Sequence, residues 1–320
     1  MLAYIRSFLF RKPIETLSPN FDICILVPMR ITYLTLKLLM RSLFGSQLTL
    51  GMSYMSEFFS PSYHVARISN SILRKLHVTK GSLLVKVTVP KHGYRYYCNV
   101  IDFAPGREEQ IIQHFKPVDG DTVIDVGANV GRYTILSSKI VGSRGRVIAI
   151  EPDPNAFHLL KKNIELNKCA NVTAINCAAY SEDLESLRLF CPLRNCGTSI
   201  YNTVMEERTS TEKFINVPAA KLDSIVQQDF ALSEHKVNWI KIDVEGAELE
   251  VLKGAERILS KSKDISVLIE VHNLRDGNFY AEIIDMLAKN NFRMSFEEVH
   301  AVGEGHIIMR KLISNELKMP

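Results

Sequence analysis

The sequence predicts an α/β protein with a doubly wound, mainly parallel sheet, preceded by an N-terminal helical extension and a β-hairpin. Three observations lead to this fold class. After residue 120, short Val/Ile-rich runs alternate with amphipathic segments, a glycine turn follows the first run, and acidic residues or His stand where several runs end. Such alternation is typical of a parallel sheet covered on both faces, with its ligand at the carboxyl ends of the strands.

The composition is that of an ordinary globular protein. The chain has 320 residues, 46% of them hydrophobic, and a formal net charge of +4, which is too small to indicate a nucleic-acid partner. The basic excess lies in the first 80 residues, which carry ten Lys and Arg against three Asp and Glu. The six cysteines form no CxxC pair and no zinc-finger spacing, so we expect neither a disulfide framework nor structural zinc, and a reducing, cytoplasmic compartment.

Residues 23–44 form the most hydrophobic stretch of the chain. Arg30, Lys37 and Arg41 interrupt it and Pro28 would kink it, so we do not expect a membrane span. In a helix the three cations would share one stripe beside apolar surface. This pattern leaves two alternatives: an interfacial helix in peripheral contact with a membrane, or a helix packed on the core. The first ten residues contain no convincing secretory signal.

The regular elements begin at about residue 83. The sequence predicts a hairpin over residues 83–89 and 94–101, followed by a helix over 107–115. A change in composition at residue 80 predicts two domains, 1–80 and 81–320. The α/β part predicts strands at 122–127, 146–151, 171–177, 239–243 and 267–272, and helices around 133–136, 154–166, 246–259 and 280–288. Residues 292–296 and 305–310 predict a final antiparallel pair, since no helix separates them.

The first turn, DVGANVGRYT (125–134), is neither a dinucleotide fingerprint nor a phosphate loop. Asn129 and Arg132 stand where the fingerprint needs its second and third glycines, and no GKS or GKT follows. Instead, Gly127 suits a tight turn, Asn129 tolerates a positive φ, and Gly131 allows the helix to pack closely on the strand.

The second strand adds a carboxylate. Glu151 ends that strand 20 residues after Gly131, where a doubly wound nucleotide site places an acceptor for the ribose hydroxyls. Asp125 lies beside the turn with only Arg132 as a nearby cation, which favours a ligand carrying an amine or a sulfonium. S-adenosylmethionine meets both requirements.

Four linked motifs carry a family resemblance. The segments VIDVGANVGRYT, IEPDPNAF, WIKIDVEGAELEVLKGA and IEVH resemble, in order and approximate spacing, the FkbM family of class I methyltransferases. The resemblance covers roughly residues 83–310. It implies a seven-stranded Rossmann-like methyltransferase sheet and S-adenosylmethionine-dependent O-methylation, often of a sugar or polyketide hydroxyl. It also implies that Asp243 lines the pocket for the methyl donor and the substrate.

The expected chemical groups stand at the ends of the fourth and fifth strands. Methyl transfer to a hydroxyl requires alignment of two reactants and an acceptor for one proton. We take His272 as the best general-base candidate, with Asp243, Glu245 and Glu270 as the other catalytic candidates. For Glu248, interaction with the helix dipole suffices. A Mg²⁺ site made by Asp243, Glu270, His272 and Asn273 is a less favoured alternative, and we expect no metal.

The cofactor site is expected to contain ten residues: Asp125, Gly127, Ala128, Asn129, Gly131, Tyr133, Glu151, Pro152, Asn176 and Asp243. Residues 191–216 lack helical periodicity and predict either a substrate loop or a plain surface loop. The expected substrate is a small molecule, glycan or glycolipid with a hydroxyl group. Two other functions compete with this one: a noncatalytic nucleoside-binding scaffold and a nicotinamide-dependent oxidoreductase, the latter disfavoured by the missing glycines.

Overall fold

The structure is a computed structural model, and it separates into two compact units, Met1–Gln110 and Ile111–Pro320. It describes strands at 14–18, 21–26, 84–89 and 94–99, and the ranges 109–190, 214–228, 236–272, 277–299 and 304–311. The two strands of the expected hairpin belong to the first unit, where they pair with strands nearer the N-terminus.

The first unit contains a four-stranded antiparallel sheet in the order β1-β2-β3-β4. Its strands are β1 (Ile14–Ser18), β2 (Phe21–Leu26), β3 (Leu84–Val89) and β4 (Tyr94–Asn99). The predicted hairpin is confirmed as β3 and β4, which pair antiparallel with Val87 opposite Tyr96. The helix expected over 23–44 is wrong for its first four residues, which pair with β3 as part of β2. The rest of that segment lies outside the described residues.

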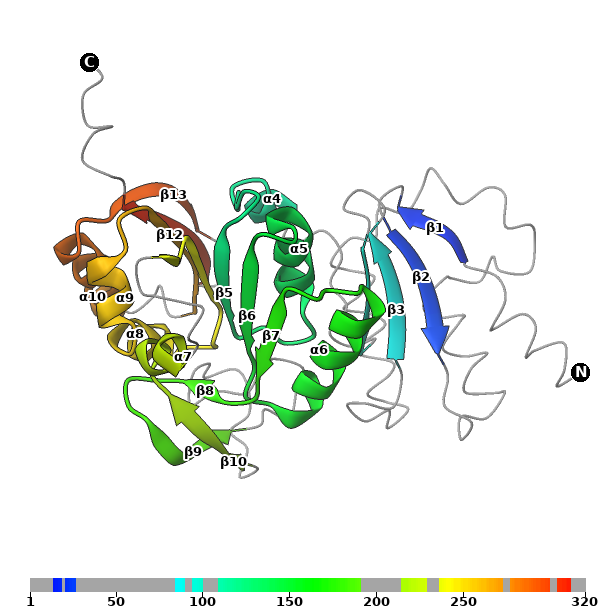
Figure 1. The fold of residues 1–320 in the computed structure, drawn as a ribbon, viewed down its shortest axis with the longest axis horizontal. Coiled ribbons are helices and arrows are strands. Elements are labelled where there is room, and N and C mark those ends of the chain that lie inside the picture. Colours follow the sequence, from blue (N-terminus) through cyan, green and yellow to red (C-terminus); the bar gives the residue numbers. More distant parts are fainter. Residues whose placement is uncertain are drawn as a thin grey trace, which may run out of the picture. The chain divides into compact units, whose positions relative to one another are not determined.

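The second unit is built on a seven-stranded sheet in the order β13-β14-β12-β11-β5-β6-β7 (Figure 1). Its strands are β5 (Thr122–Val126), β6 (Arg146–Ile150), β7 (Val172–Ile175), β11 (Trp239–Ile242), β12 (Ile265–Val271), β13 (Arg293–Val299) and β14 (Gly305–Lys311). Only β14 runs antiparallel to its two neighbours. The predicted doubly wound fold and its final antiparallel pair are therefore confirmed.

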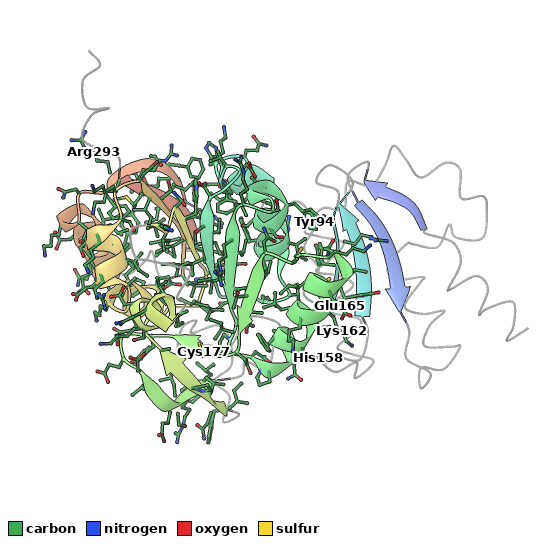
Figure 2. The ribbon with its side chains drawn as sticks, viewed as in Figure 1. Tyr94, His158, Lys162, Glu165, Cys177 and Arg293 are labelled. Atoms are coloured by element: carbon green, nitrogen blue, oxygen red, sulfur yellow. The ribbon has the colours of Figure 1, made fainter. Side chains whose placement is uncertain are left out.

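Helices cover both faces of this sheet (Figure 1). They are α5 (Arg132–Val141), α6 (Pro154–Leu166), α7 (Leu222–Gln228), α8 (Glu248–Lys253), α9 (Glu256–Lys261) and α10 (Gly277–Lys289), and α4 (Glu109–Ile112) precedes them in the chain at the division between the two units. Alternate strand residues such as Ile124 and Ile148 pack against α7 to α10, while Ala149 packs against Leu160 of α6. The opposite side of α6 carries the exposed Lys162 and Glu165 (Figure 2). This amphipathicity explains why the helix was predicted with correct bounds.

The helix expected over 246–259 is interrupted at Gly254. A Cβ there would lie 2.0 Å from the carbonyl oxygen of Tyr180, so the position requires glycine. The carboxylate of Asp223, on α7, accepts hydrogen bonds from the backbone N–H groups of Arg257 and Ile258 and so caps α9. One predicted helix is therefore two short ones.

A second, three-stranded sheet in the order β8-β10-β9 was not predicted. It consists of β8 (Ala178–Ala179), β9 (Leu184–Phe190) and β10 (Phe214–Ala220). The expected irregular stretch 191–216 is corrected at its end, because Phe214 to Asn216 belong to β10. Residues 191–213 lie outside the described residues. Within the described part of the chain, no helix is long and apolar enough to cross a membrane.

Candidate active site

The strand order reverses between β5 and β11, and in doubly wound sheets the carboxyl ends of the strands at such a reversal are where a ligand is expected to bind. The turn after β5 begins with Gly127, whose φ is 72°. A Cβ on Gly127 would lie 1.8 Å from the carbonyl oxygen of Asp243, at the end of β11. Gly127 therefore lets the two strand ends approach each other, which a larger residue would prevent.

Two further residues of the turn have the backbone that the sequence predicted. Asn129 has a φ of 49°, a left-handed conformation that Asn tolerates. Gly131 has a φ of 92°, and a Cβ there would lie 2.6 Å from Leu160 of α6. Ala128 and Tyr133 are both buried beside this turn.

Glu151 directly follows β6, and its carboxylate accepts a hydrogen bond from the backbone of the turn that follows β5. Its Oε2 accepts a hydrogen bond from the N–H of Asn129 at 2.7 Å, and its Oε1 accepts one from the N–H of Asp153 at 2.8 Å. Burial raises the pKa of Glu151 to about 7, although both hydrogen bonds act to lower it. Each carboxylate oxygen keeps a free lone pair, so ribose hydroxyls can still donate to it.

Asn176 fixes the backbone next to Glu151. Its Nδ2 donates to the carbonyl oxygen of Glu151 at 2.8 Å and to that of Pro152 at 3.1 Å. The structure therefore places Pro152 and Asn176 beside the predicted ribose acceptor, where they orient its segment.

Asp125 has a different environment from the one expected. It is fully buried, accepts a hydrogen bond from Thr134 Oγ1 at 2.6 Å, and lies 3.5 Å from Lys241 Nζ. Sequence reasoning assumed that Arg132 was the only nearby cation, and on that basis favoured a cationic ligand. Because Lys241 balances the charge of Asp125, the expectation of a single nearby cation is wrong, and Asp125 by itself does not favour a cationic ligand.

Lys241 is the functional-site residue that sequence reasoning missed. It is directly opposite Asp125 in the register of β11 and β5. Its Nζ donates to the carbonyl oxygen of Gly127 at 3.0 Å and lies 3.3 Å from Asp243 Oδ2. A lysine in the middle of a buried parallel strand was the available signal, because such a charge needs partners.

Four predicted catalytic candidates gather at the ends of β11 and β12. The Nε2 atom of His272 lies 3.7 Å from Asp243 Oδ1 and 3.7 Å from Glu245 Oε2. Glu245 has a φ of 55°, an uncommon backbone for a residue other than glycine. Glu270 completes the group, and the ligand atoms of Asp243, Glu270 and His272 all lie within 4.8 Å of one another.

Glu248 has a larger role than the helix-dipole interaction expected for it. It is fully buried, and its Oε1 lies 2.7 Å from His272 Nδ1 and accepts a hydrogen bond from the N–H of Gly246. Glu248 therefore holds the imidazole ring, with Nε2 directed toward Asp243 and Glu245. Asn273, the remaining candidate for a Mg²⁺ site, lies outside the described residues.

These carboxylates change the ionisation of His272. Burial acts to lower its pKa, but the hydrogen bond to Glu248 and the charges of Glu245, Glu248 and Asp243 raise it well above its usual value. The surrounding carboxylates therefore favour the protonated form of the imidazole over the neutral one. The predicted general-base role of His272 therefore requires that this proton is first displaced.

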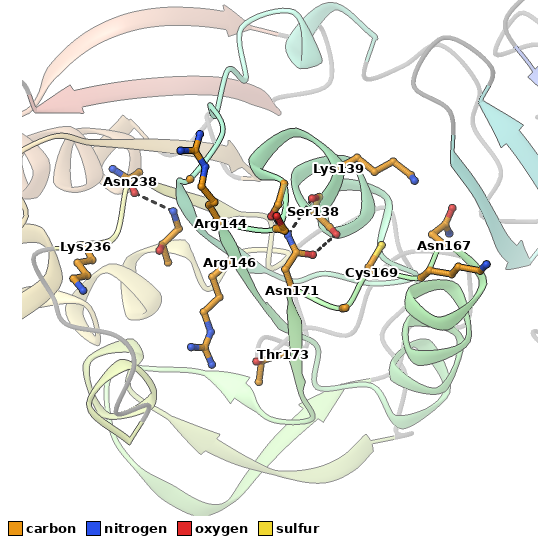
Figure 3. Close-up of a pocket in the computed structure, with 17 residues that line it drawn as sticks. Ser138, Lys139, Arg144, Arg146, Asn167, Cys169, Asn171, Thr173, Lys236 and Asn238 are labelled. Atoms are coloured by element: carbon orange, nitrogen blue, oxygen red, sulfur yellow. Dashed lines mark hydrogen bonds between the residues drawn. The ribbon is translucent and has the colours of Figure 1, made fainter.

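A concave pocket of about 1080 Å³ opens at the amino ends of the strands, where β5 and β6 begin (Figure 3). Its cationic lining residues are Lys139, Arg144, Arg146, Lys168 and Lys236, and no Asp or Glu is among the described residues that line it. Within this pocket, Ser138 Oγ donates a hydrogen bond to Asn171 Oδ1. Because doubly wound sheets bind ligands at the carboxyl ends of their strands, we do not place the reaction here.

A family model and several curated relatives are described as methyltransferases. The family model for the methyltransferase FkbM domain matches residues 125–294, more than half of the chain. Methyltransferase 1 of Beauveria bassiana is 31% identical over 152 residues, which cover 43% of this chain and 59% of that protein. Hexuronic acid methyltransferase AglP of Haloferax volcanii is 28% identical over 154 residues, covering 48% of this chain and 57% of that protein.

The chain spans less than two thirds of the length of these curated relatives. Among solved structures, P. horikoshii TYW2 in complex with MeSAdo is 18% identical, covers 77% of this chain and 81% of that chain, and has a TM-score of 0.42. A similarity at that level carries no ligand or activity across.

Proposed function

Because this chain belongs to the FkbM methyltransferase family, we propose that it transfers a methyl group from S-adenosylmethionine to a hydroxyl group of a sugar, glycan, glycolipid or related metabolite. The observation that supports this most directly is that the glycine turn, Glu151 and the group around His272 all lie at the carboxyl ends of neighbouring strands. A cofactor bound at the turn would therefore face groups that can handle a proton.

The residues present fit this cofactor. Glu151 offers carboxylate oxygens that match the two hydroxyl donors of a ribose, and the turn at Gly127 and Ala128 provides backbone beside it. Asp243 reaches solvent with 28% of its side chain exposed and can meet the amino acid part of the cofactor or the substrate. When bound, the cofactor supplies an electrophilic methyl group on sulfonium.

A substrate hydroxyl has to lose its proton as the new C–O bond forms. The side chains of Asp243 and Glu245 are 28% and 20% exposed, whereas that of His272 is 4% exposed. The two carboxylates are therefore the groups that a substrate can reach first, and we assign proton acceptance to them. The Nε2 atom of His272 lies 3.7 Å from an oxygen of each carboxylate, on their buried side, and Glu248 holds the ring there.

The substrate class is the finer part of the proposal. One relative is named a hexuronic acid methyltransferase, which favours sugar acids as the first substrates to test. The experiment is to incubate the protein with S-adenosylmethionine and panels of hexuronic acids and neutral sugars, and to follow S-adenosylhomocysteine formation together with methylated product by mass spectrometry. Product with any sugar, lost in Asp243→Asn, is the expected result. Cofactor binding without product from any hydroxylated substrate would contradict the proposal.

We also propose peripheral membrane contact through the part of residues 23–44 that follows β2, because Arg30, Lys37 and Arg41 there interrupt an otherwise apolar sequence. Replacing all three with Gln in the full chain should reduce co-sedimentation with anionic liposomes. Unchanged co-sedimentation would contradict the proposal.

A further inference from the structure

The cluster at the ends of β11 and β12 has the properties of a metal site. Asp243, Glu270 and His272 contribute two carboxylates and an imidazole, with ligand atoms within 4.8 Å of one another. We propose that these three residues bind one divalent cation, and that Mn²⁺ is the ion best matched to them. This inference deepens the proposed function and rests on it for its role, since the ion would lie where the substrate hydroxyl is activated.

The distances fit an ion between the side chains better than direct hydrogen bonds. Around an octahedral ion with metal–ligand bonds of about 2.1 Å, neighbouring ligand atoms lie about 3.0 Å apart and opposite ones about 4.2 Å apart. His272 Nε2 lies 3.7 Å from Asp243 Oδ1, which is too long for a hydrogen bond and falls within that interval. The largest separation in the cluster is at most 4.8 Å, so it exceeds the separation of opposite ligands around such an ion by at most about 0.6 Å.

The orientation of His272 is the second, independent observation. The side chain is 4% exposed, and its Nδ1 is 2.7 Å from the buried Glu248 Oε1. Its Nε2 has no hydrogen-bond partner among the described residues and is directed at the carboxylates. A carboxylate that accepts a hydrogen bond from Nδ1–H fixes the ring orientation and supports the tautomer in which Nε2 carries the lone pair, which is the usual support of a histidine that binds metal. A metal ion at Nε2 would take the place of a proton there.

Glu270 has a similar support. Its Oε2 lies 3.5 Å from Nε2 of the buried His306, which is directly opposite it in the register of β12 and β14. Two of the three proposed ligands are therefore positioned by a buried partner. This arrangement holds donor atoms in place before an ion arrives and reduces the entropy lost on binding.

The local charge also favours a cation. Asp243, Glu245, Glu248 and Glu270 surround His272, whereas Lys241 is the cation that the structure places against Asp243 within 4 Å. A divalent ion would offset this excess of negative charge. Glu245 Oε2, also 3.7 Å from His272 Nε2, is the nearest additional oxygen that the ion could use.

The donor set selects among divalent ions. Mg²⁺ strongly prefers oxygen ligands, whereas imidazole suits later transition metals, and two carboxylates with one imidazole lie between these preferences. Mn²⁺ accepts both kinds of ligand. Bound there, it would lower the pKa of a coordinated hydroxyl and so assist its loss of a proton.

The test is direct titration of the metal-free full-length protein with MnCl₂, followed by calorimetry and by electron paramagnetic resonance of free Mn²⁺. We expect one site per chain, with affinity reduced at least about tenfold in Glu270→Gln and in Asp243→Asn. Glu282→Gln, a matched change on the exposed side of α10, should leave the affinity unchanged. Absence of binding to the wild type, or binding equally strong in all three variants, would overturn the proposal.

A second measurement needs no variant and therefore does not depend on whether a variant folds. Bound Mn²⁺ should broaden the imidazole NMR signals of His272 and His306 in the wild type, and spare those of the exposed His114 and His158. Uniform broadening, or none, would count against the site.

Titration with S-adenosylmethionine on the same samples separates this inference from the proposed function. Cofactor binding without Mn²⁺ binding overturns the metal site alone. Mn²⁺ binding without cofactor binding supports the metal site and contradicts the proposed function.

Discussion

Gly127 shows how one missing side chain shapes the site. A Cβ there would overlap the carbonyl oxygen of Asp243, whereas at Gly120, with a φ of 91°, a Cβ would meet nothing within 4 Å. Gly127→Ala and Gly120→Ala therefore share the strain of a positive φ and differ in steric overlap. We expect Gly120→Ala to cost about 1 kcal/mol in the free energy of unfolding, and Gly127→Ala to cost at least about 2 kcal/mol more. Chemical denaturation of both variants measures this difference, and equal losses would contradict the steric account.

The raised pKa of Glu151 makes a prediction about pH. Its pKa is about 7 in the folded protein, so the carboxylate is charged above that value and becomes protonated as the pH falls. The charged form accepts hydrogen bonds from both ribose hydroxyls, whereas the protonated form has lost acceptor capacity. We expect the affinity for S-adenosylmethionine to fall by up to about tenfold between about pH 8 and about pH 6.

Glu151→Gln provides the control for that measurement, because the Gln side chain has nearly the same shape as Glu but does not ionise. Its affinity should be lower than that of the wild type and nearly independent of pH. If the variant shows the same pH profile as the wild type, another group causes it.

Sequence reasoning located most single residues of the site but not their partners. Gly127, Glu151, Asp243 and His272 stand at strand ends, and strand ends can be read from the apolar runs that precede them. Lys241, by contrast, is recognised only through its register with Asp125, and that pairing joins residues 116 positions apart. Local pattern contains no information on such a contact.

At the scale of elements, the parallel strands and α6 were predictable because each has its own hydrophobic period. The division between α8 and α9 was not, since it depends on Asp223 in α7, which caps α9 from more than 30 residues away. The three-stranded sheet was missed for a related reason: β8 has two residues and pairs with β10, which follows it at a distance of about 40 positions in the chain.

The cap predicts a measurable contribution to stability. Asp223→Ala removes two hydrogen bonds to the N–H groups of α9 and should lower the free energy of unfolding by about 1–2 kcal/mol. Asp285→Ala, which removes an exposed ion pair to Lys289 on α10, is the matched control and should change it by less than about 1 kcal/mol. Denaturant unfolding of the two variants compares them. Equal effects would mean that the buried cap contributes no more than a surface charge.

For the molecule as a whole, the two ends of the strands in the seven-stranded sheet differ chemically. The carboxyl ends of its strands carry the turn at Gly127, Glu151 and the carboxylates around His272, while the amino ends border the basic pocket of Figure 3. The fold class could be predicted because it follows from the order of strands and helices. The substrate could not, because no motif in the sequence specifies which hydroxyl compound would meet the groups at the strand ends.

The ligand that binds at the turn after β5 decides whether this edge of the sheet holds a methyl donor. Calorimetric titration with S-adenosylmethionine, S-adenosylhomocysteine and NAD should compare the wild type with Glu151→Ala, and with Lys236→Gln at the opposite edge as a control. We predict that both sulfur nucleosides bind, that Glu151→Ala weakens them about 10- to 100-fold, and that Lys236→Gln binds them as the wild type does. Binding of NAD in their place, or of none of the three, would contradict the assignment of a methyl-donor site.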